Sequence, residues 1–436
     1  MKKVVKFGGS SLANAEQFQK VGDIIRSDES RRYVVPSAPG KRFDEDIKVT
    51  DMLYGCYDAA SKGEDITEKI NAIKARYYEI IKGLGLSLSL EEEFKKIDED
   101  FRAQAGIQYA ASRGEFLNGK IMAAYLGYDF VDAASVIRFD KDGNLEAEET
   151  NKLLSKKLSK SQHAVIPGFY GACADGTVKT FSRGGSDVTG SLVAKAIHAD
   201  IYENWTDVSG FLVTDPRIVH NPEPIEAITY RELRELSYMG ATVLHEDAIF
   251  PVRKEGIPIN IRNTDCPDEP GTMIVEKKTT FGDISGIAGM KGYTLIRVSR
   301  DRLLEDAAAL RILLGIFERR KITVFSDAHS VDSVGIVVRS SDLMGKKDYI
   351  LNEICQCLEP DNVVLVEGIA LICIVGEQMR PCVLSAAFGA IAELGEKIRF
   401  LDCGADDIVY TIGIREEAFE QAIRKIYEKV IRLSDS

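Results

Sequence analysis

The chain has 436 residues, of which 45% are hydrophobic and 28% are charged, and its formal net charge at pH 7 is −12. This length predicts two or three domains, and the composition is typical of folded globular proteins, which excludes a wholly disordered chain. The negative charge argues against a nucleic-acid-binding surface. No apolar run comes close to the length of about 20 residues that a membrane helix needs.

The first 280 residues alternate between short apolar runs and helical patterns. The predicted strands are Val4–Phe7, Tyr33–Val35, His163–Ile166, Asp200–Trp205 and Ile257–Ile261. Helical periodicity is clear in Gly106–Leu126 and Asp187–Ala199, and the highly charged residues 64–104 predict a peripheral helical lid or interface. Strands separated by helices predict an α/β fold with a mostly parallel sheet covered by helices on both faces.

After Lys277-Lys278 the pattern changes to a repeated βαββαβ unit. The first copy is predicted as strand Tyr293–Ser299, helix Asp306–Arg319, strands Ile322–Ala328 and Ser333–Arg339, helix Lys346–Leu358 and strand Asn362–Glu367. The second copy is predicted as strand Ile369–Val375, helix Cys382–Leu394, strands Lys397–Cys403 and Ile408–Ile414, and helix Glu416–Ile431. The second copy therefore lacks its closing strand.

A sheet that is one strand short exposes an unpaired edge. The apolar stretch Ile284–Ala288, which precedes the first copy, is the candidate to fill that edge. We therefore expect the first copy to be inserted into the second. The predicted domains are residues 1–280, residues 292–367 as the inserted unit, and residues 284–291 with 368–436 as the unit that receives it.

The segment Lys6-Phe7-Gly8-Gly9-Ser10-Ser11 stands at the end of the first predicted strand and before a helix. Adjacent glycines let backbone amides approach a ligand closely, a helix N-terminus adds positive potential, and Lys6 adds a full charge. These features together predict a phosphate-binding turn. A plain Gly-Gly turn beside a surface lysine is the alternative interpretation.

A second glycine turn, Ser182-Arg183-Gly184-Gly185-Ser186-Asp187, also opens a helix. The Arg183 guanidinium offers a planar fork of donors that matches a carboxylate. Asp187 suits the first turn of a helix electrostatically, so a purely structural role is its alternative.

Two further segments carry weaker patterns. Glu115 lies inside the helical stretch Gly106–Leu126, where a single Glu is usually a solvated surface residue. Trp205-Thr206-Asp207-Val208, continuing to Thr214-Asp215-Pro216-Arg217, follows a strand, as a nucleotide-binding loop does in an open α/β sheet. Taken alone, this second segment is a polar loop with a proline turn. The scattered cysteines match no zinc spacing, so we expect reduced cysteines buried in the core of a cytoplasmic protein and no metal site.

In this order and spacing, the three motifs Lys-Phe-Gly-Gly-Ser-Ser, Arg-Gly-Gly-Ser-Asp and Trp-Thr-Asp-Val…Asp-Pro-Arg resemble those of aspartate kinases in the amino-acid kinase family. Pro167-Gly168-Phe169 and Val243-Leu244-His245 are similar to that family too, and the doubled tail resembles its paired ACT domains. The resemblance implies an amino-acid kinase fold followed by two ACT-type units. It also implies transfer of the γ-phosphate of ATP to the β-carboxylate of L-aspartate, giving 4-phospho-L-aspartate, the first step of lysine, threonine and methionine biosynthesis.

The same resemblance implies residue roles. The catalytic residues would be Lys6 and Asp187. The contacts to ATP, which would come with Mg²⁺, would be Lys6, Gly8, Gly9, Ser10, Thr206, Asp207, Leu212 and Arg217. The contacts to aspartate would be Ser37, Thr50, Glu115, Arg183 and Ser186, with Glu115 on the α-ammonium and Arg183 on the α-carboxylate.

The chemistry is consistent with these roles. A carboxylate acceptor with a pKa of about 3.9 is already a nucleophile at neutral pH, so the reaction needs no general base. A Glu in so anionic a site makes sense when it faces an ammonium group. One departure is Thr242, which stands where many family members have a Lys near the ATP phosphates; Lys254 is a candidate to supply that charge.

Paired ACT units imply control by an amino acid bound at an interface between chains, in a homodimer or homotetramer. We expect lysine as the effector, with threonine as the alternative, and Leu310, Val324, Phe325 and Ser330 as the effector residues. Two other functions remain open: a catalytically weak or inactive amino-acid sensor of the same fold, and a related kinase acting on another amino acid such as glutamate.

Overall fold

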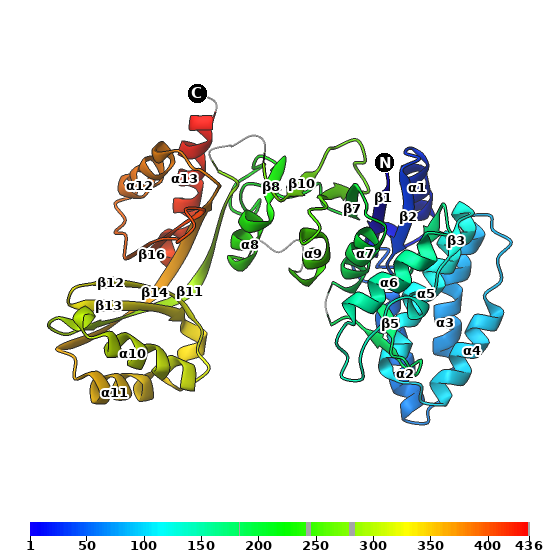
Figure 1. The fold of residues 1–436 in the computed structure, drawn as a ribbon, viewed down its shortest axis with the longest axis horizontal. Coiled ribbons are helices and arrows are strands. Elements are labelled where there is room, and N and C mark those ends of the chain that lie inside the picture. Colours follow the sequence, from blue (N-terminus) through cyan, green and yellow to red (C-terminus); the bar gives the residue numbers. More distant parts are fainter. Residues whose placement is uncertain (183, 241–245, 279–283, 435–436) are drawn as a thin grey trace. The chain divides into compact units, whose positions relative to one another are not determined.

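The computed structural model describes residues 1–182, 184–240, 246–278 and 284–434 (Figure 1). The chain forms two compact units. As far as they are described, the first comprises residues 1–211, 226–230 and 243–277, and the second comprises residues 212–225, 231–242 and 278–436. Residues 212–225 and 231–240, which the sequence analysis assigns to the first domain, thus cluster with the second unit.

An eight-stranded sheet organises the first unit, in the order β3-β4-β2-β1-β7-β9-β10-β8. Its strands are β1 (Lys3–Phe7), β2 (Arg31–Pro36), β3 (Asp129–Phe130), β4 (Ala164–Val165), β7 (Ile201–Thr206), β8 (Ala227–Thr229), β9 (Ile259–Asn263) and β10 (Thr272–Val275). The strands from β3 to β9 are parallel, β10 is antiparallel to β9, and β8 is parallel to β10. The mostly parallel sheet predicted from the sequence is confirmed.

All five strands predicted for this unit are present, whereas β3, β8, β10 and the separate hairpin of β5 (Tyr170–Ala172) and β6 (Val178–Thr180) were not predicted. The predicted strands are the long or fully apolar ones; Val4 and Val5, for example, are completely buried. Such runs are typical of strands covered on both faces. The strands that were missed have only two to four residues, too few for a period to be recognised.

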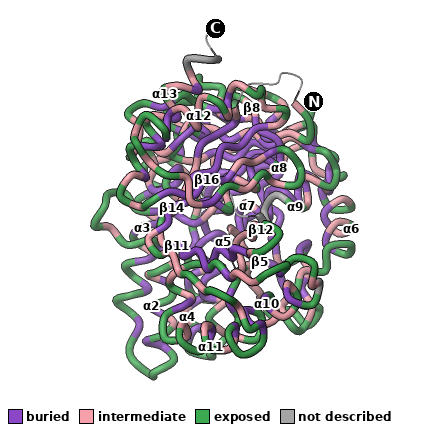
Figure 2. Tube along the Cα trace, turned by 90° about the vertical axis from the view of Figure 1, so that its left-hand side faces the viewer, coloured by how far each residue is buried: buried purple, intermediate pink, exposed green. Residues whose placement is uncertain are grey.

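Helices cover both faces of this sheet. They are α1 (Ala15–Arg26), α2 (Val49–Ser61), α3 (Thr67–Gly83), α4 (Glu91–Arg102), α5 (Ile107–Leu126), α6 (Ala147–Leu158), α7 (Gly185–Ala196) and α9 (Glu246–Arg253). The charged segment 64–104 is not a peripheral lid, because Tyr77 of α3 and Phe94 of α4 are buried in the same core as Val5 and Leu117. Buried and exposed residues alternate along α2, α3 and α4, as Figure 2 shows, whereas α7 has no exposed residue.

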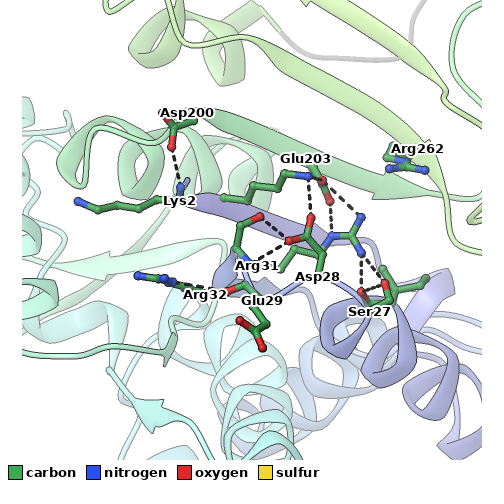
Figure 3. A network of polar contacts seen from close by, with 12 residues as sticks. Lys2, Ser27, Asp28, Glu29, Arg31, Arg32, Asp200, Glu203 and Arg262 are labelled. Carbon is green, nitrogen blue, oxygen red and sulfur yellow. Dashed lines mark hydrogen bonds and ion pairs between the residues drawn. The ribbon is translucent and has the colours of Figure 1, made fainter.

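A buried ionic cluster joins the first residues of β1 and β2 to β7 (Figure 3). The carboxylate of Glu203 lies 2.9 Å from Lys3 Nζ and 2.8 Å from Arg31 Nε, and it accepts a hydrogen bond of 2.9 Å from Trp205 Nε1. Burial raises the pKa of Glu203, but Arg31 and Lys3 outweigh it and hold that pKa below its ordinary range. This cluster fixes the strands on one face of the sheet, so the next residue, Asn204, faces the other side.

In the second unit, a six-stranded antiparallel sheet has the order β12-β13-β11-β14-β16-β15. Its strands are β11 (Gly286–Ser299), β12 (Val324–Ser330), β13 (Ser333–Arg339), β14 (Asn362–Val375), β15 (Phe400–Cys403) and β16 (Val409–Arg415). Its helices are α8 (Tyr230–Tyr238), α10 (Ala307–Arg319), α11 (Lys347–Leu358), α12 (Pro381–Glu393) and α13 (Phe419–Ser434). This is the doubled βαββαβ arrangement that the sequence predicts.

The two copies share their central strands. Ile287 pairs with Ile374 and Ala288 with Cys373, so the pairing predicted for Ile284–Ala288 is confirmed from Gly286 onward. The predicted strands Asn362–Glu367 and Ile369–Val375 are one strand, β14, whose Gly368 has a φ of +68° at the point where the copies meet. Each copy keeps its own core, with Ile316 and Ile336 in the first and Ile372 and Ile426 in the second.

Two expectations from composition can be compared with this fold. Among the described residues, no helix combines the length and the apolar character needed to cross a bilayer. The cysteines are unpaired, but only Cys56, Cys173 and Cys373 are buried, so the expectation that the cysteines belong to the core holds for a minority of them.

Candidate active site

The loops after four parallel strands meet at the carboxyl edge of the sheet in the first unit. Gly8 N donates to Trp205 O at 3.0 Å, Ser37 N to Phe7 O at 3.1 Å, and Gly168 N to Pro36 O at 3.1 Å. These bonds join the segments that follow β1, β2, β4 and β7. In open α/β sheets this edge is where ligands bind.

Lys6 and Asp187 come together at this edge. Lys6 Nζ lies 2.6 Å from Asp187 Oδ1, and Lys6 is only 8% exposed. A third residue, Asn204, completes a triangle: its Oδ1 accepts from Lys6 Nζ at 3.1 Å, and its Nδ2 donates to Asp187 Oδ1 at 3.1 Å. The two residues predicted to be catalytic are therefore in direct contact.

The first glycine turn is built for close backbone approach. A Cβ on Gly40 would lie 2.6 Å from Gly9 C, and Gly40 N donates to Gly9 O at 2.8 Å. A Cβ on Gly8 would lie 3.8 Å from Lys6 Nζ, so the Gly8 backbone borders the ammonium. Gly8 and Gly9 are half-buried, and Ser10 is exposed.

One expectation about this turn is wrong. Residues Ser10–Leu12 form a single 3-10 turn, and α1 begins only at Ala15, capped by the side chain of Asn14. The N-terminus of α1 is therefore not at the glycines. Positive potential at Gly8 and Gly9 comes from Lys6 and from the backbone amides of the turn itself.

The second glycine turn leads directly into α7. Gly184 has a φ of +55°, in the left-handed region that favours glycine, and α7 begins at Gly185. Ser186 is buried against the loop after β4, where a Cβ on Gly168 would lie 2.5 Å from Ser186 Oγ. Arg183, the predicted contact for the α-carboxylate, lies outside the described residues.

Glu115 is buried on α5 beside the loop that follows β2. It is 6% exposed, and its Oε2 has no hydrogen-bond partner in the part of the chain that the structure describes. Burial raises the pKa of Glu115 to about 8, although backbone N–H groups, including that of Ala38, oppose the shift. A buried carboxyl group with an unused oxygen is expensive unless a ligand completes it.

Two other predicted aspartate contacts, Ser37 and Thr50, lie on segments that pack against the helix of Glu115. A Cβ on Gly114 would lie 2.8 Å from Ala38 Cβ and 3.8 Å from Thr50 Oγ1, so α5 packs directly on the segments that carry Ser37 and Thr50. Asn118 Nδ2 donates to Ser37 O at 2.6 Å, and Asn118 is fully buried. Ser37, Thr50 and Glu115 are therefore brought together.

The predicted nucleotide contacts divide between the two units. Thr206 ends β7, and its hydroxyl donates to Asp207 Oδ1 at 3.0 Å. Leu212 and Arg217 belong to the second unit, where Leu212 is 39% exposed and Arg217 is paired with Asp215 at 2.6 Å. Thr242 and Val243-Leu244-His245 lie outside the described residues, and Lys254 is exposed just after α9.

Asn204 was missed by the sequence analysis. The available signal was a polar amide inside the strand Ile201–Thr206, in register with Lys6 on the neighbouring strand. Asn118, one helical turn after Glu115, gave a similar signal. Among the described residues there is no group of three or more His, Cys, Asp and Glu side chains that could hold a metal ion.

The four predicted effector residues do not form one cluster within the chain. Leu310 and Val324 pack against the core of the first copy. Phe325, at an irregularity in the pairing of β12 with β13, stacks on Tyr238 of α8 with ring centroids 5.4 Å apart. Ser330 is exposed at the end of β12.

Known proteins resemble this chain over nearly its whole length. The model of the amino acid kinase family matches residues 1–263. Aspartokinase 3 of Bacillus subtilis is 34% identical over 447 residues, which cover 98% of this chain and 98% of that protein.

Solved structures agree. The crystal structure of the aspartate kinase of Clostridium acetobutylicum is 44% identical, with a TM-score of 0.89 over 99% of this chain and 100% of that one. E. coli aspartokinase III is 25% identical. Its complex with aspartate and ADP (R-state) has a TM-score of 0.71 and covers 99% of this chain and 100% of that one. Its complex with lysine and aspartate (T-state) has a TM-score of 0.72 and covers 98% of this chain and 99% of that one. With a family model that covers more than half of it and a Bacillus relative that matches it almost from end to end, this chain belongs to the amino acid kinase family, and within that family to the aspartokinases.

Proposed function

We propose that this protein transfers the γ-phosphate of ATP to the β-carboxylate of L-aspartate and so makes 4-phospho-L-aspartate. The observation that carries the proposal is the buried carboxyl group of Glu115, whose Oε2 has no hydrogen-bond partner among the described residues. The segment of Ser37 and Ala38 connects it to the end of β1, the strand that carries Lys6, because Ser37 N donates to Phe7 O. A phosphate-binding turn beside an acceptor for an ammonium group suits an amino acid as the second substrate. The aspartate and ADP bound to E. coli aspartokinase III support the same pair of ligands.

The nucleotide would bind at the first glycine turn. Lys6 and the amides of Gly9 and Ser10 would hold the β- and γ-phosphates, and Gly8, whose own amide donates to Trp205 O, would lie beside them. Asp187 would keep the Lys6 ammonium in place. Thr206 and Asp207, with Leu212 and Arg217, would contact the rest of the nucleotide. Magnesium would enter with ATP as part of that substrate and screen its charge.

Aspartate would bind along α5 and the loop after β2. Glu115 would receive the α-ammonium and Arg183 the α-carboxylate, while Ser37, Thr50 and Ser186 would complete the pocket. The β-carboxylate is a nucleophile without a general base, so catalysis consists of bringing two anions together and offsetting their repulsion. Lys6 is the described side chain best placed to do so.

Regulation would come from the ACT-type units. We propose lysine as the effector, with threonine as the alternative, because E. coli aspartokinase III has been solved with lysine bound in its T-state. The proposal includes a cytoplasmic homodimer or homotetramer assembled through these units, acting in the first step of lysine, threonine and methionine biosynthesis. It assigns residues 1–280 to catalysis, 292–367 to the inserted unit, and 284–291 with 368–436 to the other.

A coupled assay of ADP release tests the substrate, with L-aspartate, L-glutamate and N-acetylglutamate compared at equal concentration. Release that depends on aspartate alone is the expected result, and a preference for another acceptor would reassign the enzyme. Effector binding without any ATP turnover would indicate an amino-acid sensor, an outcome that Thr242 in place of the usual Lys makes worth testing. Adding lysine and threonine, separately and together, identifies the effector.

A further inference from the structure

Asn204 occupies the centre of the site and has no role in the proposal so far. It is 4% exposed and lies opposite Lys6 in the register of two parallel strands, β1 and β7. Both ends of its amide are used: Oδ1 accepts from Lys6 Nζ at 3.1 Å, and Nδ2 donates to Asp187 Oδ1 at 3.1 Å.

The chemistry of its two neighbours dictates the orientation of this amide. An ammonium group has only donors and an ionised carboxylate has only acceptors, so the amide oxygen must face Lys6 and the amide nitrogen must face Asp187. No other uncharged side chain as short as Asn carries two separate polar atoms, an acceptor for Lys6 and a donor for Asp187. Ser and Thr have a single hydroxyl, whose one oxygen would have to reach both charged groups.

Asn204 also sets the charge of the site. An ammonium group has three N–H donors, and among the described residues Lys6 Nζ is bound only to Asp187 and Asn204. One donor is therefore left, and the ammonium is bordered by the backbone of Gly8, where a phosphate oxygen would arrive. A neutral amide holds the lysine without adding a second negative charge beside the incoming polyphosphate.

We propose that Asn204 is a positioning residue for phosphoryl transfer, acting through Lys6 and Asp187 and not on either substrate directly. The inference rests on the proposed function, since it takes Lys6 as the cation that meets the transferred phosphate. Two substitutions separate the parts of the role. Asn204→Leu keeps the size and removes both hydrogen bonds, whereas Asn204→Asp keeps an acceptor for Lys6 and places a carboxylate against Asp187.

Asn204→Leu should lower kcat about 10- to 100-fold, the scale of losing hydrogen bonds to charged groups, and should change the KM for aspartate less than about threefold. Asn204→Asp should in addition raise the KM for ATP, because its charge repels the phosphates. A substitution that disturbed only packing would not separate kcat from the aspartate KM in this way.

The decisive experiment is a double-mutant cycle with Lys6→Met, in which kcat and the affinity for ATP, by calorimetry, are measured for all four proteins. If Asn204 acts through Lys6, Asn204→Leu will cost almost nothing further once Lys6 is gone. Equal losses in both backgrounds would overturn the inference. Thr150 on α6 is buried, and its hydroxyl oxygen accepts a hydrogen bond from Arg138 N. Thr150→Val, which removes this bond, is the matched control and should have the same effect in both backgrounds.

Failure of this inference can be distinguished from failure of the proposed function. If the unmodified protein releases no ADP with aspartate, the proposed function fails, and the ATP-affinity cycle still decides whether Asn204 and Lys6 are coupled. Thermal melting of each variant reports folding. If Asn204→Leu does not fold, the cycle is run with Asn204→Asp, whose size and shape match the native side chain.

Discussion

Lys6 Nζ and Asp187 Oδ1 lie 2.6 Å apart, although the two residues come from different motifs at the ends of different elements. Lys6 is the last residue but one of β1, and Asp187 lies in the first turn of α7. The ion pair is largely buried, with side-chain exposures of 10% and 18%. Breaking a pair of this kind by removing one partner leaves an uncompensated charge in a low-dielectric site.

Replacing Lys6 by Met should therefore reduce turnover by about 10²–10³-fold, the scale of losing one preorganised electrostatic partner. The reason is the loss of the cation at the turn that would meet the γ-phosphate. Steady-state ADP release at saturating ATP and aspartate measures the effect. Lys20→Met is the matched control, because Lys20 on α1 forms an exposed ion pair with Asp265 and its loss should leave turnover unchanged. Near-normal turnover in Lys6→Met would remove Lys6 from the mechanism.

The pKa of Glu115, raised to about 8, predicts how aspartate binding depends on pH. Only the ionised carboxylate attracts the substrate's ammonium group, so the KM for aspartate should fall as pH rises from about 6.5 to about 8.5, with a limiting slope near tenfold per pH unit below the pKa. The profile of kcat/KM for aspartate checks this. Glu115→Gln should bind aspartate weakly at every pH and show no such rise. A flat profile in the native protein would mean that Glu115 does not receive the ammonium.

The same group makes the stability of the ligand-free protein depend on pH. Its pKa in the folded state lies above the unfolded value of about 4.3, so the folded state holds the proton more tightly, and stability falls as pH rises from about 4.3 through about 8. Glu115→Gln removes this loss and should melt at least about 2 °C above the native protein at pH 8, with a smaller difference at pH 5. Melting curves without substrate give both values. Glu148→Gln, on the exposed surface of α6, should show no such trend.

Sequence patterns predict the secondary structure and the repeated tail of this protein well, because the patterns that indicate them are local in sequence. The periodicity of apolar residues and the turn residues between them predict the doubled tail. Counting its strands shows that the second copy lacks one, which Ile284–Ala288 can supply. The sequence could not predict that β11 and β14 each run through both copies as one strand. Glycines at the junctions, such as Gly292 and Gly368, look like the ends of strands.

Prediction of the site has the same limit, because residues without a local pattern are missed. Lys6, Asp187 and Glu115 stand in recognisable motifs, whereas Asn204 has no motif and matters only through its register with Lys6. Register is set by contacts distant in sequence, such as the cluster of Lys3, Arg31 and Glu203, and not by local propensity. The 3-10 turn after Gly9 escaped prediction for a different reason: Asn14 provides a better helix cap than either glycine.

Insertion of one copy into the other predicts a long-range effect on stability. Ile287 precedes the first copy in sequence, yet it is 2% exposed and buried in the core of the second. Ile287→Ala should destabilise the protein by about 2–4 kcal/mol, the usual cost of such a truncation in a core. Limited proteolysis should then cut first within residues 369–434. Leu401→Ala, on the same sheet but 42% exposed, is the control. First cuts within residues 292–367 would contradict the shared-strand account.

The stack of Phe325 on Tyr238 predicts how an effector signal leaves the ACT-type units. Phe325 lies on β12 with two other predicted effector residues, Val324 and Ser330, and Tyr238 lies on α8. α8 begins at Tyr230, directly after β8, a strand of the catalytic sheet. A shift of β12 on effector binding would therefore reach that sheet through α8. Coupling of this kind needs a contact that differs between two states.

Phe325→Ala should raise the concentration of effector needed for half-inhibition by about 5- to 100-fold, while kcat without effector stays within about twofold of the native value. Tyr238→Ala should have the same effect, and the double variant should add little, because both remove one contact. Inhibition curves with lysine or threonine, whichever acts, provide the measurement. Val331→Ala, in the exposed turn after β12, is the control. Because Phe325 could also touch the effector itself, Tyr238→Ala is the deciding variant: if it leaves inhibition unchanged, the signal does not pass through this stack.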